Sequence, residues 1–234
     1  MNARAPSPDD LKHAAAEAAV ALVEDGMVVG LGTGSTASHA ITLLGERHRL
    51  GLRILGVPTS LATARHAAAE GIPLLDAPDG RVIDLTIDGA DEIGEADLSL
   101  IKGMGGALLW EKIVASASRR VVIIADDTKL APRLTGRVAV PVEVVEFGWA
   151  ATQARLAALG CVPELRCDDF GEAYRTDGGN RIFHCHFDDL SDPAAVERAL
   201  SMVVGVVESG LFIGLATTVL VASASGVRRI DRDR

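Results

Sequence analysis

The sequence has little cysteine, few aromatic residues and fewer basic than acidic residues. Its three cysteines, Cys161, Cys167 and Cys185, are an odd number in a chain of 234 residues. That count suits reduced thiols better than a disulfide framework. Aromatic residues make up only 3% of the chain, although 48% of it is hydrophobic. This balance is typical of repeated strand–helix units whose sheet is covered on both faces.

Basic residues are too few to balance the acidic ones. The chain has 23 Lys and Arg against 32 Asp and Glu, which is a formal net charge of −9. A field of this sign repels nucleic acids and anionic membranes, so we expect no nucleic-acid partner. A small phosphorylated metabolite is still allowed, because a few local N–H groups and lysines outweigh a distant net charge.

No hydrophobic run is long enough to span a membrane. The most apolar stretch, residues 211–224, is shorter than a bilayer core requires and is interrupted by polar residues and Gly214. The N-terminal residues include acidic side chains where a secretory signal needs an uninterrupted apolar segment. We therefore expect a cytoplasmic protein with no membrane association.

The chain instead has a regular alternation of helical and strand patterns. Ser7 and Pro8 form a helix start, and apolar residues then recur at helical spacing until Gly26. The patterns that follow predict strands at 27–31, 52–57, 82–87 and 121–125. They predict helices at 37–48 and 61–70, and a further helix that begins after Lys102 and runs through Glu111 to Ser118. Strands that alternate with helices predict an α/β fold with a doubly wound, mostly parallel, Rossmann-like sheet.

The order of elements changes near residue 138. From there the patterns predict strands at 140–144, 162–166, 172–176, 181–187 and 206–208, and helices at 148–159 and 193–204. This order is typical of a ferredoxin-like βαββαβ unit. We therefore expect two domains: a Rossmann-like catalytic domain formed by residues 1–136 and 209–234, and a smaller α+β domain formed by residues 137–208.

A glycine-rich turn, GLGTGST at residues 30–36, joins the first predicted strand to a helix. Its glycines let the backbone approach an anion, and the helix N-terminus presents free N–H groups. A dinucleotide site would need a glycine in place of Ser35, and a Walker A loop would need a lysine before Ser35. The turn therefore predicts a phosphate site and not a nucleotide site, while a tight turn without a ligand is the alternative.

An acidic segment comes directly after the strand predicted at 82–87. Asp88 and Asp91 fall at the carboxyl edge of the parallel sheet, where such folds bind ligands. A solvated Asp-Gly turn is the alternative interpretation. A Mg²⁺ site on the two aspartates lacks further ligands to complete an octahedron, so we expect no metal.

A second glycine-rich loop begins at Lys102, and Glu111 lies one to two turns into the helix that follows. A lone glutamate on a helix is usually a solvated surface charge. Here residues 108–110 are Leu-Leu-Trp, an apolar setting in which burial raises the proton affinity of a carboxylate. Glu111 is therefore a candidate general base.

The remaining candidates are isolated in the sequence. Lys129 follows the strand predicted at 121–125, and Lys12 on the first helix could fold over the same sheet edge, although most lysines are solvated. His184 and His186 flank Cys185 in a predicted strand, so both histidines share one face at a spacing that a zinc pair could use. Two further ligands are not evident, and we expect no zinc site.

Taken together, the segments GLGTGSTA, DGADE, KGMGGALLWEK and ADDTK, in that order and spacing, resemble the A-type ribose-5-phosphate isomerases. The resemblance extends over essentially the whole chain, including VPVEVVEFGW and the TDGGN turn. It implies interconversion of ribose 5-phosphate and ribulose 5-phosphate without metal or organic cofactor, in the non-oxidative branch of the pentose phosphate pathway. Apolar strands in the second domain lead us to expect a homodimer or homotetramer.

The resemblance also implies roles for individual residues. Glu111 matches the proton acceptor, which would move a proton between C2 and C1 through a cis-enediolate. Lys102 would stabilise charge on the enediolate oxygens, and Asp88 or Asp91 would shuttle hydroxyl protons. The expected substrate-binding residues are Thr33, Gly34, Ser35, Thr36, Gly89, Ala90, Gly103, Met104, Gly105, Lys129 and Lys12.

The sequence departs from the family's pattern at three positions. Met104 stands where glycine is common, Trp110 where a polar residue is common, and His184 where an acid is usual. Two other activities also use such residues: acyl-CoA transfer through a glutamate nucleophile, for which the chain is short, and sugar-phosphate sensing without catalysis. A sensor usually carries a DNA-binding helix-turn-helix and can dispense with a base, so the combination of Lys102 and Glu111 favours the isomerase.

Overall fold

The largest part of the fold is a six-stranded sheet. The computed structural model describes residues 6–75 and 80–232. The six strands lie in the order β14-β13-β6-β3-β1-β2, and only β14 runs antiparallel to its neighbour. Their bounds are β1 Val28–Leu31, β2 Leu55–Pro58, β3 Leu85–Asp88, β6 Val121–Asp126, β13 Thr218–Ser223 and β14 Gly226–Asp231. The predicted mostly parallel sheet is thus confirmed.

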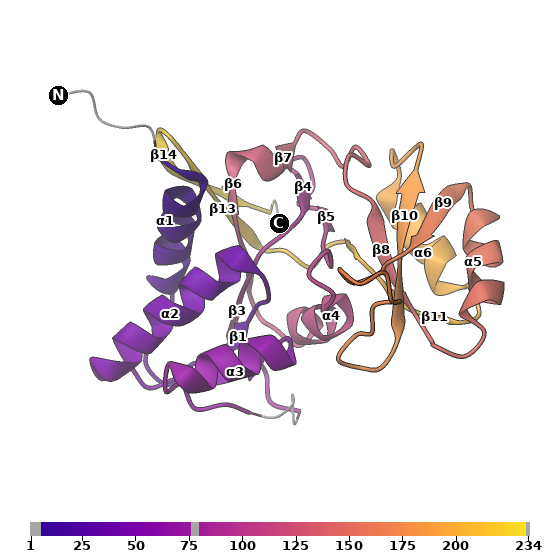
Figure 1. The fold of residues 1–234 in the computed structure, drawn as a ribbon. Helices are drawn as coiled ribbons and strands as arrows, with labels where there is room; N and C mark the ends of the chain where they lie inside the picture. The colour runs from indigo at the N-terminus through magenta and orange to yellow at the C-terminus, as the bar shows by residue number, and fades with distance from the viewer. Residues whose placement is uncertain (1–5, 76–79, 233–234) are drawn as a thin grey trace.

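Helices α1 (Pro8–Val20) and α2 (Ser35–Arg49) cover one face of this sheet, α3 (Leu61–Ala69) lies beside β2, and α4 (Leu108–Ser116) lies toward the other unit of the molecule (Figure 1). Ser7 is the N-cap of α1, as predicted, and the structure adds a capping box between Ser7 and Asp10. Strand β6 shows how both faces are buried: Val122 and Ile124 pack under α1 and α2, while Val121 and Ile123 pack in a second cluster on the opposite face.

A smaller antiparallel sheet lies at the other end of the molecule (Figure 1). Its strands lie in the order β11-β8-β10-β9, and helices α5 and α6 complete the predicted βαββαβ sequence of elements. The bounds are β8 Val140–Val144, α5 Trp149–Ala157, β9 Cys161–Leu165, β10 Arg181–Phe187, α6 Pro193–Ser201 and β11 Val206–Ser209. We propose that this small unit is a separate domain bounded near residues 136 and 208. All four strands of its sheet lie within these bounds, except that β11 extends one residue further, to Ser209.

The prediction of a strand at 172–176 is wrong. That segment makes only an isolated bridge between Cys167 and Ala173, and its backbone then turns back on itself through the bond from Thr176 N to Asn180 O. Its side chains make long-range contacts instead: the Arg175 guanidinium, for example, pairs with Glu146. Tertiary contacts override the local strand preference of this segment.

Four very short strands form a third sheet that the sequence did not predict. They lie in the order β12-β5-β4-β7, with bounds β4 Glu92–Gly94, β5 Leu100–Ile101, β7 Leu130–Ala131 and β12 Leu211–Phe212. Strands of two or three residues carry no readable periodicity. This sheet packs on the face of the six-stranded sheet opposite α1 and α2, and the end of β5 places Lys102 next to the end of β3.

Candidate active site

The candidate site lies where the loops after β1, β3 and β6 meet the loop after β5 and the first turn of α4. These segments enclose a cavity of about 350 Å³, which is within the size range of small-molecule sites. The cavity is lined by Pro8, Leu11, Lys12, Thr33, Gly34, Ser35, Thr36, Gly89, Ala90, Asp91, Lys102, Gly103, Gly105, Glu111, Asp126, Thr128 and Lys129. Segments separated by up to 121 residues along the chain therefore share one cavity.

The N-terminus of α2 forms one wall of the cavity. Gly34 is the N-cap of this helix and has a φ of 112°, a conformation that favours glycine. Because glycine has no side chain, no side-chain hydrogen bond caps the helix. The first N–H groups of α2 are therefore available to an anion. The Lys12 ammonium, from α1, donates a hydrogen bond to Ser35 Oγ at 3.0 Å and adds positive charge at the same place.

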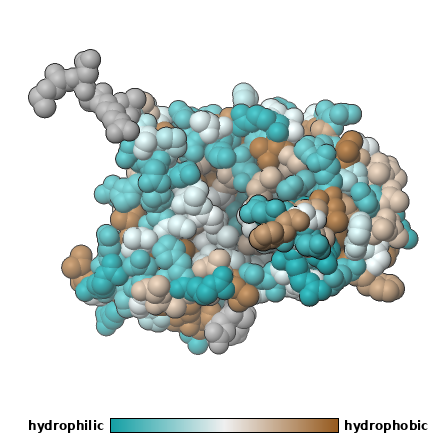
Figure 2. All heavy atoms as spheres, in the orientation of Figure 1, coloured by the Kyte–Doolittle hydropathy of each residue, from teal (hydrophilic) through white to brown (hydrophobic). Residues whose placement is uncertain are grey.

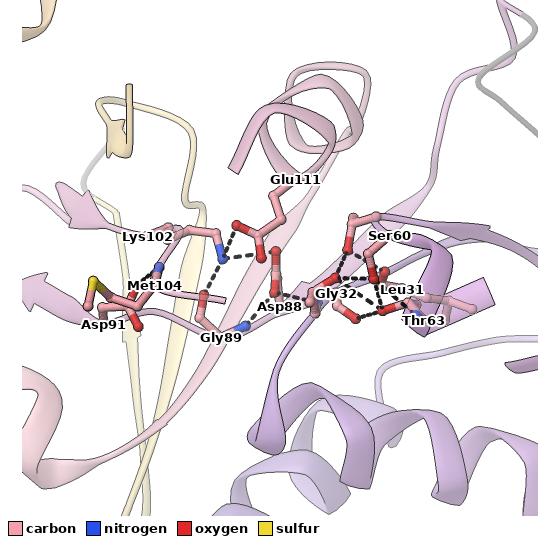
Figure 3. A network of polar contacts seen from close by, with 12 residues as sticks. Leu31, Gly32, Ser60, Thr63, Asp88, Gly89, Asp91, Lys102, Met104 and Glu111 are labelled. Atoms are coloured by element: carbon pink, nitrogen blue, oxygen red, sulfur yellow. Dashed lines mark hydrogen bonds and ion pairs between the residues drawn. The ribbon is translucent and has the colours of Figure 1, made fainter. Parts of the chain in front are cut away.

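Thr33 is held by a cluster of hydroxyl groups from the loop before α3 and its first turn. Its Oγ1 lies 2.7 Å from Thr59 Oγ1, 3.0 Å from Ser60 Oγ and 3.1 Å from Thr63 Oγ1. Figure 3 shows this network beside the end of β1. The side chain of Thr33 thus anchors the turn to α3, and the part of Thr33 that remains for a ligand is chiefly its backbone.

Asp88 ends β3 and links the glycine-rich turn after β1 to Lys102. Its Oδ1 accepts hydrogen bonds from Thr33 N at 3.2 Å and Gly89 N at 2.7 Å, and its Oδ2 lies 2.9 Å from Lys102 Nζ. The approach is so close that a Cβ built on Gly32 would come 2.3 Å from Asp88 Oδ1. Burial raises the pKa of Asp88, and the charge of Lys102 acts against that shift.

Lys102, which lines the cavity, lies among three oxygen acceptors (Figure 3). Besides Asp88, its Nζ donates to Gly89 O at 2.6 Å and lies 3.3 Å from Glu111 Oε2. Burial disfavours the charged ammonium, but the carboxylates of Asp88 and Glu111 outweigh this effect and raise the pKa of Lys102. Lys102 is therefore a permanent buried cation at neutral pH.

Glu111 points toward Lys102 from the first turn of α4 (Figure 3) and is only 3% exposed. Burial is the main cause that raises its pKa to about 8, against the opposing charge of Lys102. Oε2 pairs with Lys102 at 3.3 Å, yet it accepts no well-directed hydrogen bond. The carboxylate is thus desolvated, has a free lone pair and has a pKa close to neutral pH. These are the properties that a general base requires.

Asp91 holds the loop that follows Lys102. Its Oδ2 accepts a hydrogen bond from Met104 N at 3.0 Å. Met104, which stands where the family commonly has glycine, is 37% exposed and does not line the cavity. The part of this loop that lines the cavity is formed by Gly103 and Gly105.

The structure brings nearly all the predicted residues together. Asp88 is the exception among the charged ones, since it lies beneath the cavity and acts through Lys102 and Thr33. Sequence reasoning did not single out Asp126, Thr128, Pro8 and Leu11, which also line the cavity. The sequence indicates these residues only weakly. Asp126 ends the strand before Lys129, and Pro8 and Leu11 precede Lys12 within about one turn of α1.

The two histidines of β10 do not form a metal site. Their side chains share a face opposite the buried Cys185, as predicted. Across residues 6–75 and 80–232, however, no group of three or more His, Cys, Asp and Glu residues is placed to hold a metal ion.

Over the same ranges, no helix is both long and apolar enough to cross a bilayer.

Fold and site together define an α/β enzyme in which the buried side chains of Asp88, Lys102 and Glu111 lie next to the uncapped N-terminus of a helix. A profile of the family "Ribose 5-phosphate isomerase A (phosphoriboisomerase A)" matches residues 55–226. The chain is 55% identical over 219 residues to ribose-5-phosphate isomerase A of Gloeobacter violaceus, which covers 94% of this chain and 95% of that relative.

Solved structures agree. The structure of ribose 5-phosphate isomerase A from Methanocaldococcus jannaschii matches with a TM-score of 0.92 and 37% identity, over 97% of this chain and all of that one. A D-ribose-5-phosphate isomerase in complex with phospho-erythronic acid matches with a TM-score of 0.93 and 36% identity over the same shares. The chain belongs to the ribose 5-phosphate isomerase A family.

Proposed function

We propose that this protein interconverts D-ribose 5-phosphate and D-ribulose 5-phosphate, with Glu111 as the proton acceptor. The observation that carries the proposal is the buried Glu111 carboxylate 3.3 Å from the Lys102 ammonium, in the same cavity as the N-terminus of α2. Membership of the isomerase family supports the overall reaction.

The reaction moves one proton between neighbouring carbons. Glu111 removes the proton from C2 of the open-chain aldose, which leaves a cis-enediolate, and returns it to C1. Because one carboxylate serves both carbons, it needs a lone pair that is not already committed to a strong hydrogen bond. The Oε2 atom of Glu111 meets this requirement.

Negative charge develops on the O1 and O2 oxygens in this step. Lys102 is the nearest cation to Glu111, and its ammonium is already positioned by Asp88 and Gly89 O. A preorganised cation in a water-poor site stabilises such charge strongly. Asp91, which lines the cavity, is the candidate for moving hydroxyl protons when the sugar ring opens, whereas Asp88 lies beneath the cavity and positions Lys102. No step requires a metal or an organic cofactor.

The phosphate end of the substrate is distant from the reacting carbons. We assign it to the first N–H groups of α2 with Ser35 and Thr36, together with Lys12 and Lys129 on the cavity wall. Binding energy from this remote group positions the reacting carbons. The small substrate, and not a nucleic acid, is the partner that the cavity and the net charge of −9 favour.

Replacing the base tests the proposal. Glu111→Gln should lower kcat by about 10²–10⁴-fold, the usual contribution of a general base. Binding of ribose 5-phosphate or phospho-erythronic acid, measured by calorimetry, should survive because the phosphate site is untouched. Near-normal turnover of the variant in an NMR assay of ribose 5-phosphate would refute the assignment of Glu111. A wild-type protein that does not convert ribose 5-phosphate would refute the activity itself.

We further propose that the enzyme acts in the non-oxidative branch of the pentose phosphate pathway, in the cytoplasm, as a homodimer or homotetramer. Hydrophobic side chains exposed on the small unit support self-association: Phe147, Phe170, Met202 and Val204 are each more than 75% exposed. Figure 2 shows hydrophobic residues among hydrophilic ones on the visible surface of that unit. Light scattering of the purified protein at several concentrations tests the oligomeric state.

A further inference from the structure

A segment of the small unit contacts the active-site loops twice. The first contact is made by Tyr174, whose ring lies against Gly106 in the loop after Lys102. A Cβ built on Gly106 would come 2.4 Å from Tyr174 Oη and 2.8 Å from two ring carbons. Gly106 also closes this loop, since its N–H donates to Gly103 O at 2.9 Å. The tyrosine therefore packs directly on the turn that separates Lys102 from α4.

Tyr174 is itself held in place. The guanidinium of Arg166, at the end of β9, lies 3.9 Å from the centroid of the Tyr174 ring, a cation–π distance. The Tyr174 N–H donates to Arg166 O at 2.9 Å. From the other side of the loop, Asp91 binds Met104 N at 3.0 Å. The loop is thus held between an aspartate of the six-stranded-sheet unit and a tyrosine of the small unit.

The second contact is made by Asp177. Its Oδ2 accepts a hydrogen bond of 2.7 Å from Leu61 N, the first N–H of α3. Ser60 and Thr63, at the same end of α3, bind the hydroxyl of Thr33. Asp177 is therefore linked through the start of α3 to the phosphate turn.

The turn that carries Asp177 is anchored to the small sheet. Glu143, which is 1% exposed in the middle of β8, accepts hydrogen bonds of 2.9 Å from both Thr176 Oγ1 and Asn180 Nδ2. A buried carboxylate with two donors fixes the turn firmly. The contacts of Tyr174 and Asp177 thus start from a rigid support.

We propose that residues 174–177 form a bridging segment that positions both halves of the active site: Tyr174 positions the loop after Lys102, and Asp177 positions α3 and, through it, Thr33. This inference rests on the proposed isomerase activity. Small displacements of catalytic groups are costly, since a shift of about 1 Å can lower the rate by about 10²-fold. Tyr174 and Asp177 are positioning residues, because neither lines the cavity.

The two contacts predict different kinetic effects. Tyr174→Ala should lower kcat by about tenfold with little change in KM, because it loosens the loop that carries Lys102 and precedes Glu111. Asp177→Ala should mainly raise KM, because it loosens the phosphate turn. Tyr174→Phe and Asp177→Asn should both stay near wild type, since the first keeps the ring and the second keeps an oxygen acceptor. Phe170→Ala, at a 92% exposed position four residues before the bridging segment, is the matched control.

Amide hydrogen exchange gives a test that does not depend on activity. Residues 103–107 should exchange faster in Tyr174→Ala than in wild type, while their exchange in Asp177→Ala should not change. If Tyr174→Ala does not fold, Tyr174→Leu replaces it with the same expectations. The proposal is overturned if the alanine variants keep kcat and KM within about twofold of wild type, or if only their melting temperatures change. Failure of the proposed function would instead appear as a wild-type protein without isomerase activity but with the same exchange pattern.

Discussion

Glu111 is buried and lies beside a cation, and these two conditions act on its pKa in opposite directions. Burial prevails, so the proton affinity of Glu111 rises while Lys102 stays charged. A solvated glutamate would be fully ionised at neutral pH but a weak base. The raised pKa makes Glu111 a stronger base while a useful fraction of it is still ionised.

This raised pKa predicts the pH dependence of activity. The base acts only when deprotonated, so kcat/KM should rise as the pH increases through a pKa of about 8 and level off above it. Lys102, whose pKa is raised, stays protonated throughout this range. Initial rates between pH 6 and 9.5 measure the profile, and the residual rate of Glu111→Gln should lack this rise. A rate that is flat down to pH 6 would show that Glu111 is not the group that titrates.

At the scale of single elements, the turn after β1 depends on a close approach between Gly32 and Asp88. A Cβ on Gly32 would come 2.3 Å from Asp88 Oδ1 and 2.6 Å from Asp88 Cα, and backbone cannot move aside cheaply. Gly32→Ala should therefore cost about 1–3 kcal/mol of stability, as overpacking usually does, and should reduce activity by displacing Asp88. Urea denaturation measures the loss. Gly178→Ala, whose neighbours all lie at 3.5 Å or more, should cost much less.

Elements with a strong local signal could be predicted from sequence. The N-cap of α1 at Ser7, the β10 strand at 181–187 and the glycine-rich turn before α2 all follow from neighbouring residues. Elements that depend on distant partners could not, as the third sheet shows with its strands of two or three residues. The same reason explains the wrong prediction of a strand at 172–176. Tyr174 within this segment and Asp177 just after it make contacts with residues about 70 and 116 positions away.

The residues of the site likewise fall into those that local sequence could predict and those whose placement depends on distant partners. Motifs predicted that residues 33–36, Lys102 and Glu111 share one site, because each follows a strand or opens a helix, and the structure places them around one cavity. The sequence could not reveal that the Thr33 side chain is occupied by α3 hydroxyls or that Asp88 lies beneath the cavity. Those facts depend on how three loops pack, and packing depends on the whole chain.

At the scale of the whole molecule, the charged groups of the site balance one another without a metal. Lys102 lies between two carboxylates, and the described parts of the chain contain no cluster of three or more potential metal ligands. We therefore expect that incubation with EDTA followed by desalting leaves kcat and KM unchanged. Loss of activity that a divalent cation restores would contradict the mechanism. Elemental analysis of the purified protein provides the control.

The start of α2 has one consequence for how this protein tolerates change. The groups that we propose to bind the phosphate there are mainly main-chain amides, which every residue except proline supplies. Most point mutations at these positions should therefore preserve anion binding, whereas a single change at Glu111 should remove most of the turnover. Anchoring is mutationally robust and chemistry is fragile, so inactive variants that still sequester the sugar phosphate should arise more readily than variants that have lost both.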